Sequence, residues 1–243
     1  MSGYNGGFFM ERIRTAQRLG RLLKEEGIQN STMVAVYWVD RTDRDEYWDH
    51  NDRETLKFIK SKVEIDKIED ASAFASAFIN GKDNIEAVYS YLLNFYTDEE
   101  LKKYYQSNFY MFSFSLASVQ KIEEYLNSLE LNHDQIKTVL LATINLGLDE
   151  CKVRNDLVLK LFNNDKEFLV FLAAERSLYY PYGYIDVPEA LEFLVQEIGI
   201  EKARQFLEDN KNSLYFLFYR GKEYRTQYQA LFDEATEMIE QYK

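Results

Sequence analysis

The polar segment 40–54 contains the residue types best suited to chemistry. Arg44 and His50 are separated by five residues, and several carboxylates lie among them. In such a pair the arginine would steady the charge of a phosphate, and the histidine would carry a proton to or from the reacting oxygen. The chain has only 2 histidines, His50 and His133, so histidine-dependent catalysis is confined to these positions. Arg44 and His50 are therefore the candidate catalytic residues.

The spacing of this pair resembles the Arg-x5-His motif of HEPN-type ribonucleases, which are small helical proteins. The resemblance implies an enzyme that acts on nucleic acid or another phosphate ester through Arg44 and His50. The alternative is a solvated loop or helix face, because the spacing arises easily by chance and no second motif accompanies it.

The carboxylates of the same segment resemble an EF-hand calcium loop, with Asp43 at its first position and Glu54 at its twelfth. Trp48 occupies the sixth position, where such loops need glycine, and Tyr47 replaces a short oxygen ligand. We therefore predict no metal site. The single cysteine, Cys151, excludes an internal disulfide and a cysteine-type zinc site. The chain also lacks the common phosphate-binding and hydrolase motifs, so we expect no cofactor.

Two further sets of residues are candidates for binding a partner. Arg14, Arg18 and Arg21 follow i, i+4, i+7 and share one helix face, within a basic stretch that ends at Lys24. They would bind a phosphate backbone or an acidic partner, or dock on the chain's own carboxylates, which the net charge of −12 favours.

The second candidate is a tyrosine loop, with Tyr179, Tyr180, Tyr182 and Tyr184 around Pro181. Tyrosine supplies rigid, amphipathic contact area, which suits an interface. The alternative is that these rings cover the core between two helices.

The elements that must position these residues are predicted to be helices. The chain has 10 glycines and 2 prolines, fewer than the turns of a sheet-rich fold require. Apolar residues recur at helical spacing through most of the sequence, as in Ile85, Val88, Tyr89 and Leu92. The predicted fold is all-α, with antiparallel helix pairs joined by short loops. Residues 33–39 are β-branched and aromatic, so a small β-hairpin near residues 33–48 and a buried helical turn both remain open.

Helix starts recur at a nearly constant interval. Capping boxes are predicted at Thr97, Asn132 and Asn164, and a weaker start at Gly199, which gives intervals of 35, 32 and 35 residues. A period near 34 is typical of stacked two-helix repeats. An irregular bundle of capped amphipathic helices would give the same offsets, so a short α-solenoid-like stack and a helical bundle are both retained.

Composition bounds the remaining expectations. We predict an N-terminal part, residues 1–67, and a helical-pair part, residues 68–243, in one continuous globular unit. The start of the sequence has no basic and apolar signal pattern and no run approaches a membrane span, so we expect a cytoplasmic protein without a membrane partner. The acidic chain makes nucleic acid an unfavourable partner and suits a basic protein partner, while the oligomeric state stays open.

No catalytic set converges in the sequence. The leading functional prediction is therefore a non-enzymatic protein-binding module: a scaffold, an adaptor, or an inhibitor such as an immunity or antitoxin-like protein. The alternatives are a HEPN-like or other phosphate-acting enzyme that uses Arg44 and His50, and a helical nucleic-acid-binding protein that uses the N-terminal arginines.

Overall fold

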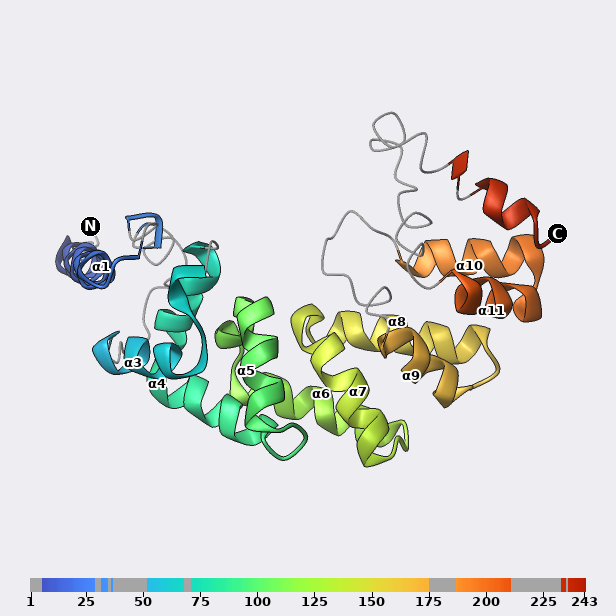
Figure 1. Ribbon diagram of the computed structural model, residues 1–243, viewed down its shortest axis with the longest axis horizontal. Coiled ribbons are helices and arrows are strands. Elements are labelled where there is room, and N and C mark those ends of the chain that lie inside the picture. Colours follow the sequence, from blue (N-terminus) through green and yellow to red (C-terminus); the bar gives the residue numbers. More distant parts are fainter. Residues whose placement is uncertain are drawn as a thin grey trace, which may run out of the picture. The chain divides into compact units, whose positions relative to one another are not determined.

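The structure of the chain is a computed structural model. It describes residues 6–28, 32–34, 36, 52–67, 71–174, 187–210, 233–234 and 236–243. Within these ranges every regular element is a helix and no strand occurs, so the all-α prediction is confirmed (Figure 1). None of the described helices combines the length and the apolar character that a membrane crossing requires.

The chain divides into two compact units, Met1–Gln120 (unit 1) and Lys121–Lys243 (unit 2). The helices on either side of the boundary predicted at residues 67 and 68 both belong to unit 1. The division predicted there stays a prediction.

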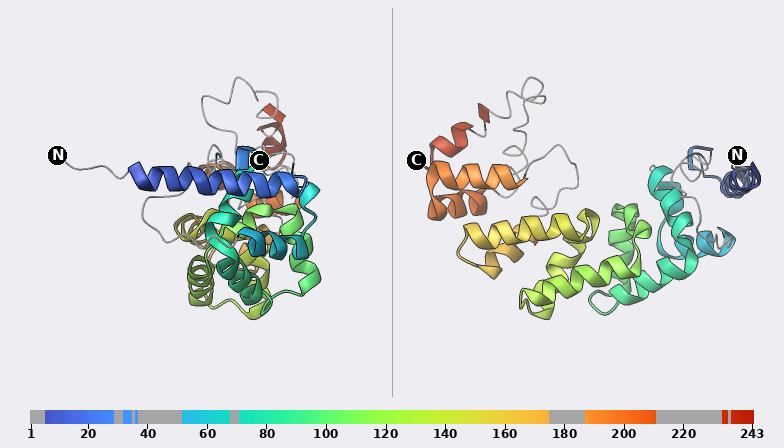
Figure 2. Two further views of the ribbon diagram at one scale, coloured as in Figure 1. Left: turned by 90° about the vertical axis from the view of Figure 1, so that its left-hand side faces the viewer. Right: turned by 180° about the vertical axis from the view of Figure 1, so that it is seen from behind.

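Unit 1 begins with a long helix and continues through shorter ones. Its elements are α1 (Gly6–Glu25), α3 (Asp52–Lys62), the 3₁₀ helix η1 (Ile65–Lys67), α4 (Ala71–Leu92), α5 (Asp98–Ser107), the 3₁₀ helix η2 (Phe109–Ser113) and the first residues of α6 (Leu116–Ser128). Figure 2 shows α1 as one uninterrupted helix. It ends at Glu25, because Gly27 takes φ 81° and the Ile28 N–H donates to the Leu23 carbonyl at 2.9 Å.

An aromatic core holds unit 1 together. The fully buried rings of Phe74, Tyr105 and Phe112 lie between α4, α5 and η2. The Tyr105 and Phe112 ring centroids are 4.6 Å apart in an edge-to-face arrangement, a geometry that aromatic pairs prefer. The apolar stripe predicted for α4 is buried as expected. The polar side chain of Asn84 fixes the start of α6, since its amide donates to the Phe114 carbonyl at 2.8 Å.

Unit 2 consists of short helices joined by brief turns. Its elements are the remainder of α6, α7 (His133–Thr143), the 3₁₀ helix η3 (Ile144–Leu146), α8 (Leu148–Leu161), α9 (Lys166–Ala174), α10 (Val187–Ile198) and α11 (Ile200–Asp209). Residues 233–234 and 236–240 are also helical.

Helices of unit 2 contact the next helix and also the next but one. α8 packs on α9 and α10 packs on α11, as antiparallel neighbours joined by short turns would do. In addition, α7 packs on α9 and α8 packs on α10. Tyr125 of α6 donates to Asp156 of α8 at 2.8 Å, and Arg204 of α11 lies 4.8 Å from the centroid of the Phe168 ring of α9.

The predicted helix starts are largely confirmed. Thr97 and Asn132 each form a complete capping box with the residue three positions ahead. The prediction for Asn164 is wrong: this residue has φ 60° and belongs to the turn that ends α8, because its N–H donates to the Leu159 carbonyl. Asp165 is the cap instead, and its carboxylate accepts the Phe168 N–H at 2.9 Å. A left-handed residue cannot also present its side chain to the next helix in the extended geometry of a cap.

Glycine separates consecutive helices where no loop intervenes. Gly147 and Gly199 stand directly before α8 and α11, with φ 79° and 78° and ψ near 166° and 165°. This backbone region is accessible essentially to glycine alone. A single glycine can therefore end one helix and begin the next without a longer loop between them.

Several predictions concern residues outside the described ranges. Residues 32–34 and 36 are helical, which favours the helical turn at the start of the 33–48 segment, and the hairpin is not confirmed. The tyrosine loop and most of the 40–54 segment lie outside the described residues.

Candidate partner-binding surface

The structure describes only part of the predicted site residues. Arg44, His50 and the four tyrosines Tyr179, Tyr180, Tyr182 and Tyr184 lie outside the described ranges. Arg14 is part of α1, but its side chain lies outside the description. Arg18 and Arg21 are described and are exposed on α1, so the site is built from these two residues.

Two ion pairs place α3 beside α1. The Arg18 guanidinium lies 3.7 Å from the Asp52 carboxylate, and the Lys60 ammonium lies 2.6 Å from the Glu26 carboxylate. The two contacts are eight residues apart on each helix, and both residue numbers rise together. The facing stretches of α1 and α3 therefore run side by side in the same direction.

Each of these helices exposes a basic side. Arg21 lies two positions, or about 200° of helical rotation, from each of the fully buried residues Leu19 and Leu23. It therefore lies on the side of α1 opposite to the core. Lys57 lies two positions from Thr55 and Ile59, which are also buried. The exposed basic residues of the pair, here called the basic face, are Arg18, Arg21, Lys24, Arg53, Lys57 and Lys60.

The charge of the basic face contrasts with that of the chain. α1 and α3 together contain nine basic and four acidic residues, an excess of +5 in a chain of net charge −12. Within the described part of the chain, Arg53, Lys57 and Lys24 form no hydrogen bond or ion pair, and Arg21 contacts only the carbonyl of Gln17 in its own helix. Within the described residues these four cations have no carboxylate partner.

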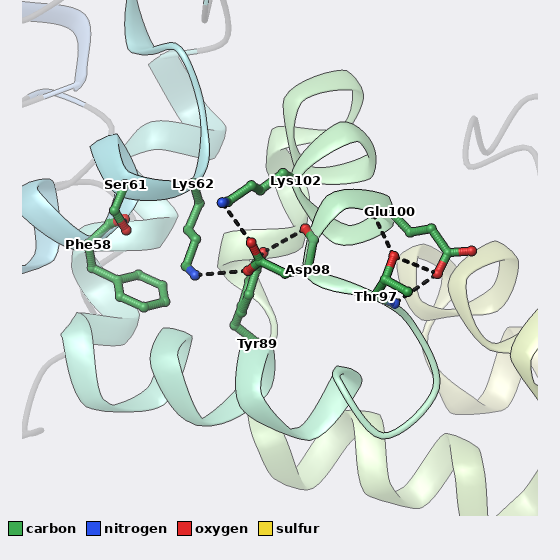
Figure 3. Close-up of polar contacts among 8 residues, drawn as sticks. All are labelled: Phe58, Ser61, Lys62, Tyr89, Thr97, Asp98, Glu100 and Lys102. Carbon is green, nitrogen blue, oxygen red and sulfur yellow. Dashed lines mark hydrogen bonds and ion pairs between the residues drawn. The ribbon is translucent and has the colours of Figure 1, made fainter.

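A polar cluster behind α3 holds that helix in place (Figure 3). Lys62, at the end of α3, donates to the Asp98 carboxylate of α5 at 3.2 Å. Its ammonium also lies 4.1 Å from the centroid of the Tyr89 ring of α4 and 5.6 Å from that of Phe58. The same carboxylate accepts Lys102 at 2.6 Å and the Tyr89 hydroxyl at 2.9 Å. One side chain thus joins three helices.

The cluster is tuned for structure and not for proton transfer. Hydrogen bonds from Lys102 and Tyr89, with Lys62 beside them, lower the pKa of Asp98 from 3.8 to about 2. Burial, together with the hydrogen bond to Asp98, raises the pKa of Tyr89 well above its usual value of 10.0. The pKa values of Asp98 and Tyr89 therefore both lie further from pH 7 than those of free side chains. The charge of Lys62 is paired with Asp98 within the protein.

Unit 2 contains a second set of interior polar groups, around Cys151. Burial raises the pKa of this thiol from 9.0 to about 11, and Asn155 donates to its sulfur at 3.4 Å. A buried thiol with a raised pKa fits a structural role. Arg154 is buried beside it and forms an ion pair with Glu150 at 2.8 Å. In the described residues no three histidine, cysteine, aspartate or glutamate side chains group as metal ligands.

Comparison of the chain with protein-family models, with curated proteins and with solved structures found no match. The chemistry of the site is therefore argued from its own residues.

The sequence pointed to one half of the basic face. The spacing of Arg14, Arg18 and Arg21 was visible along α1, whereas Arg53, Lys57 and Lys60 were not singled out. Arg53, Lys57 and Lys60 have the same i, i+4, i+7 spacing. Arg53, however, lies inside the polar segment 40–54, so the start of this helix is not visible in the sequence. That the two triplets become neighbours depends on the pairing of α1 with α3, which no local pattern encodes.

Proposed function

We propose that this chain is a non-enzymatic protein-binding module whose helices form a short α-solenoid-like stack. The observation that carries the proposal is the contact of alternate helices in unit 2. α6, α8 and α10 form one series of neighbours, and α7, α9 and α11 form the other. Stacked helical hairpins produce this two-layered pattern, and such stacks serve as extended surfaces for other proteins.

The spacing of helix starts supports the same arrangement. α5, α7, α9 and α11 begin at Asp98, His133, Lys166 and Ile200, at intervals of 35, 33 and 34 residues. In chain order, α4, α6, α8 and α10 precede these four helices, and α8 packs on α9 as α10 packs on α11. The buried positions also recur, as Leu101, Ile136 and Ala203 show three residues after these starts. Equal spacing with equal burial is expected of repeated hairpins.

The displaced pKa values of the described residues have structural causes. Tyr105, Tyr125 and Cys151 have raised pKa values, mainly because they are buried. Asp98 and Asp165 have lowered ones, because they accept hydrogen bonds. Every displaced pKa in the described residues lies further from pH 7 than the ordinary pKa of that group. General acid–base catalysis uses groups whose pKa lies near pH 7.

The test is whether a defined complex forms. We expect the tagged chain, purified from its native host, to retain one partner protein in fixed stoichiometry. We further expect the recombinant pair to re-form the complex in light scattering and calorimetry. The enzyme alternative predicts a different outcome: cleavage of RNA or of a phosphate ester by the chain alone, abolished by His50→Ala. That result would replace the proposal.

A further inference from the structure

We infer that the basic face of α1 and α3 binds a short acidic segment of the partner protein. This inference rests on the proposed protein-binding function and names the chemistry of one contact. The first step is the positive charge itself. The two helices carry an excess of +5, so the remainder of this chain carries −17. A local positive field on an acidic protein attracts anions to that place and repels them elsewhere.

The second step is that contacts with other helices hold the basic residues of this face in place. Ion pairs at 3.7 Å and 2.6 Å hold α1 against α3, and Lys62 anchors α3 to Asp98 at 3.2 Å on the other side. Gln106 of α5 adds two hydrogen bonds to the backbone of Glu64, just after α3. The cations of α3 therefore project from a helix that packs on α4 and α5, which lowers the entropic cost of binding.

The third step is the size of the charge pattern. Residues i to i+7 of a helix span about 10 Å along its axis, and the ion pairs of Arg18 and Lys60 bring α1 and α3 within side-chain reach of each other. Within that area Arg18 and Lys60 are already paired with carboxylates, whereas Arg21, Lys24, Arg53 and Lys57 have no described acidic partner. The face therefore has the capacity for about four carboxylates on a few turns of helix or a short extended segment.

The fourth step decides between an acidic peptide and a nucleic acid. A nucleic-acid backbone carries a phosphate about every 3.4 Å along each strand and continues beyond a short contact. It would then extend past the basic face onto the rest of unit 1, which carries a net charge of −9 outside these two helices. A compact acidic segment ends where the positive charge ends. The observations therefore favour a protein segment.

The test uses the full chain and a charge-reversal variant, Arg53→Glu with Lys57→Glu. The matched control is Lys121→Glu with Lys160→Glu, which makes the same charge change at two exposed lysines of α6 and α8. The probe is a fluorescent peptide of about twelve residues with four carboxylates at helical spacing, and its binding is followed by anisotropy at low salt. We expect the α3 variant to bind about tenfold more weakly than wild type, and the control to lose much less.

Three outcomes would overturn the inference: equal weakening in both variants, unchanged affinity in the α3 variant, or tighter binding of a single-stranded oligonucleotide than of the peptide. If circular dichroism shows that the charge-reversed chain is misfolded, Arg53→Gln with Lys57→Gln supplies the test, with a smaller expected loss. The proposed function is judged separately. A partner protein that binds wild type and the α3 variant equally would leave that function standing and remove only the acidic contact.

Discussion

Replacing Tyr105 by phenylalanine should make unit 1 more stable. The Tyr105 side chain is fully buried, and its ring packs 5.2 Å from the Tyr89 ring and 4.6 Å from the Phe112 ring, measured between centroids. Among the described residues, none forms a hydrogen bond with its hydroxyl group. A buried hydroxyl without a partner costs about 1–3 kcal/mol. Phenylalanine keeps the ring contacts and removes that cost, so we expect a gain of about 1 kcal/mol in the free energy of unfolding.

Tyr89→Phe is the matched control, because it removes the same atom from a neighbouring ring. The Tyr89 hydroxyl donates to the Asp98 carboxylate at 2.9 Å and lies 3.2 Å from the Asp98 carbonyl. Loss of a hydrogen bond to a charged group costs about 1.5–3 kcal/mol, less where solvent replaces it as at this partly exposed carboxylate. The two substitutions should therefore change stability in opposite directions.

The assay must report on unit 1 by itself, since two units need not unfold together. Hydrogen exchange of the α5 amides gives a local free energy of opening, and urea unfolding followed by circular dichroism gives the overall midpoint. A change of 1 kcal/mol corresponds to about 2–4 °C in melting temperature for a chain of this size. If Tyr105→Phe lowered stability by more than about 0.5 kcal/mol, the hydroxyl would have a partner and the reasoning would be refuted.

Four further predictions follow from individual contacts. The pKa of Asp98 is about 2 in the folded state, against an ordinary 3.8. The ionised carboxylate therefore stabilises the folded state fully above about pH 4, and this stabilisation is lost as the pH falls towards 2. In Asp98→Asn, the free energy of unfolding of unit 1 should therefore fall less between pH 4 and pH 2 than in wild type, by about 1 kcal/mol or less. The same pH dependence in both proteins would contradict this prediction. Asp165→Ala should destabilise α9 by about 1–2 kcal/mol in hydrogen exchange, whereas Asn164→Gly should be neutral or stabilising; the reverse order would restore Asn164 as the cap. Gly147→Ala should cost about 1–3 kcal/mol in urea unfolding through backbone strain alone, since a Cβ there would meet nothing within 4 Å. Cys151 should resist iodoacetamide at pH 8 until the chain unfolds, because the thiol is buried with a pKa near 11; rapid labelling of the native protein would show that it is accessible.

The sequence by itself determined the local structure of this protein. Helix starts at Thr97 and Asn132, and the stop at Gly27, depend on groups within a few residues of each other, so their chemistry is visible in the sequence. Apolar spacing likewise identified core positions such as Val88 and Leu92, because helical period alone decides which side chains share a face. The cap predicted at Asn164 failed by one residue, since two helix ends compete for the same short turn.

The tertiary structure decided which faces became neighbours. Asp98 is one of three acidic residues in the first turn of α5, yet it accepts Lys62 from 36 residues away and Tyr89 from another helix. The basic face needs both α1 and α3, which Arg18–Asp52 and Lys60–Glu26 bring together across 34 positions of the sequence. Long-range ion pairs of this kind depend on how the buried sides of several helices pack at once, and a periodicity shows only which side is buried and not what it is buried against.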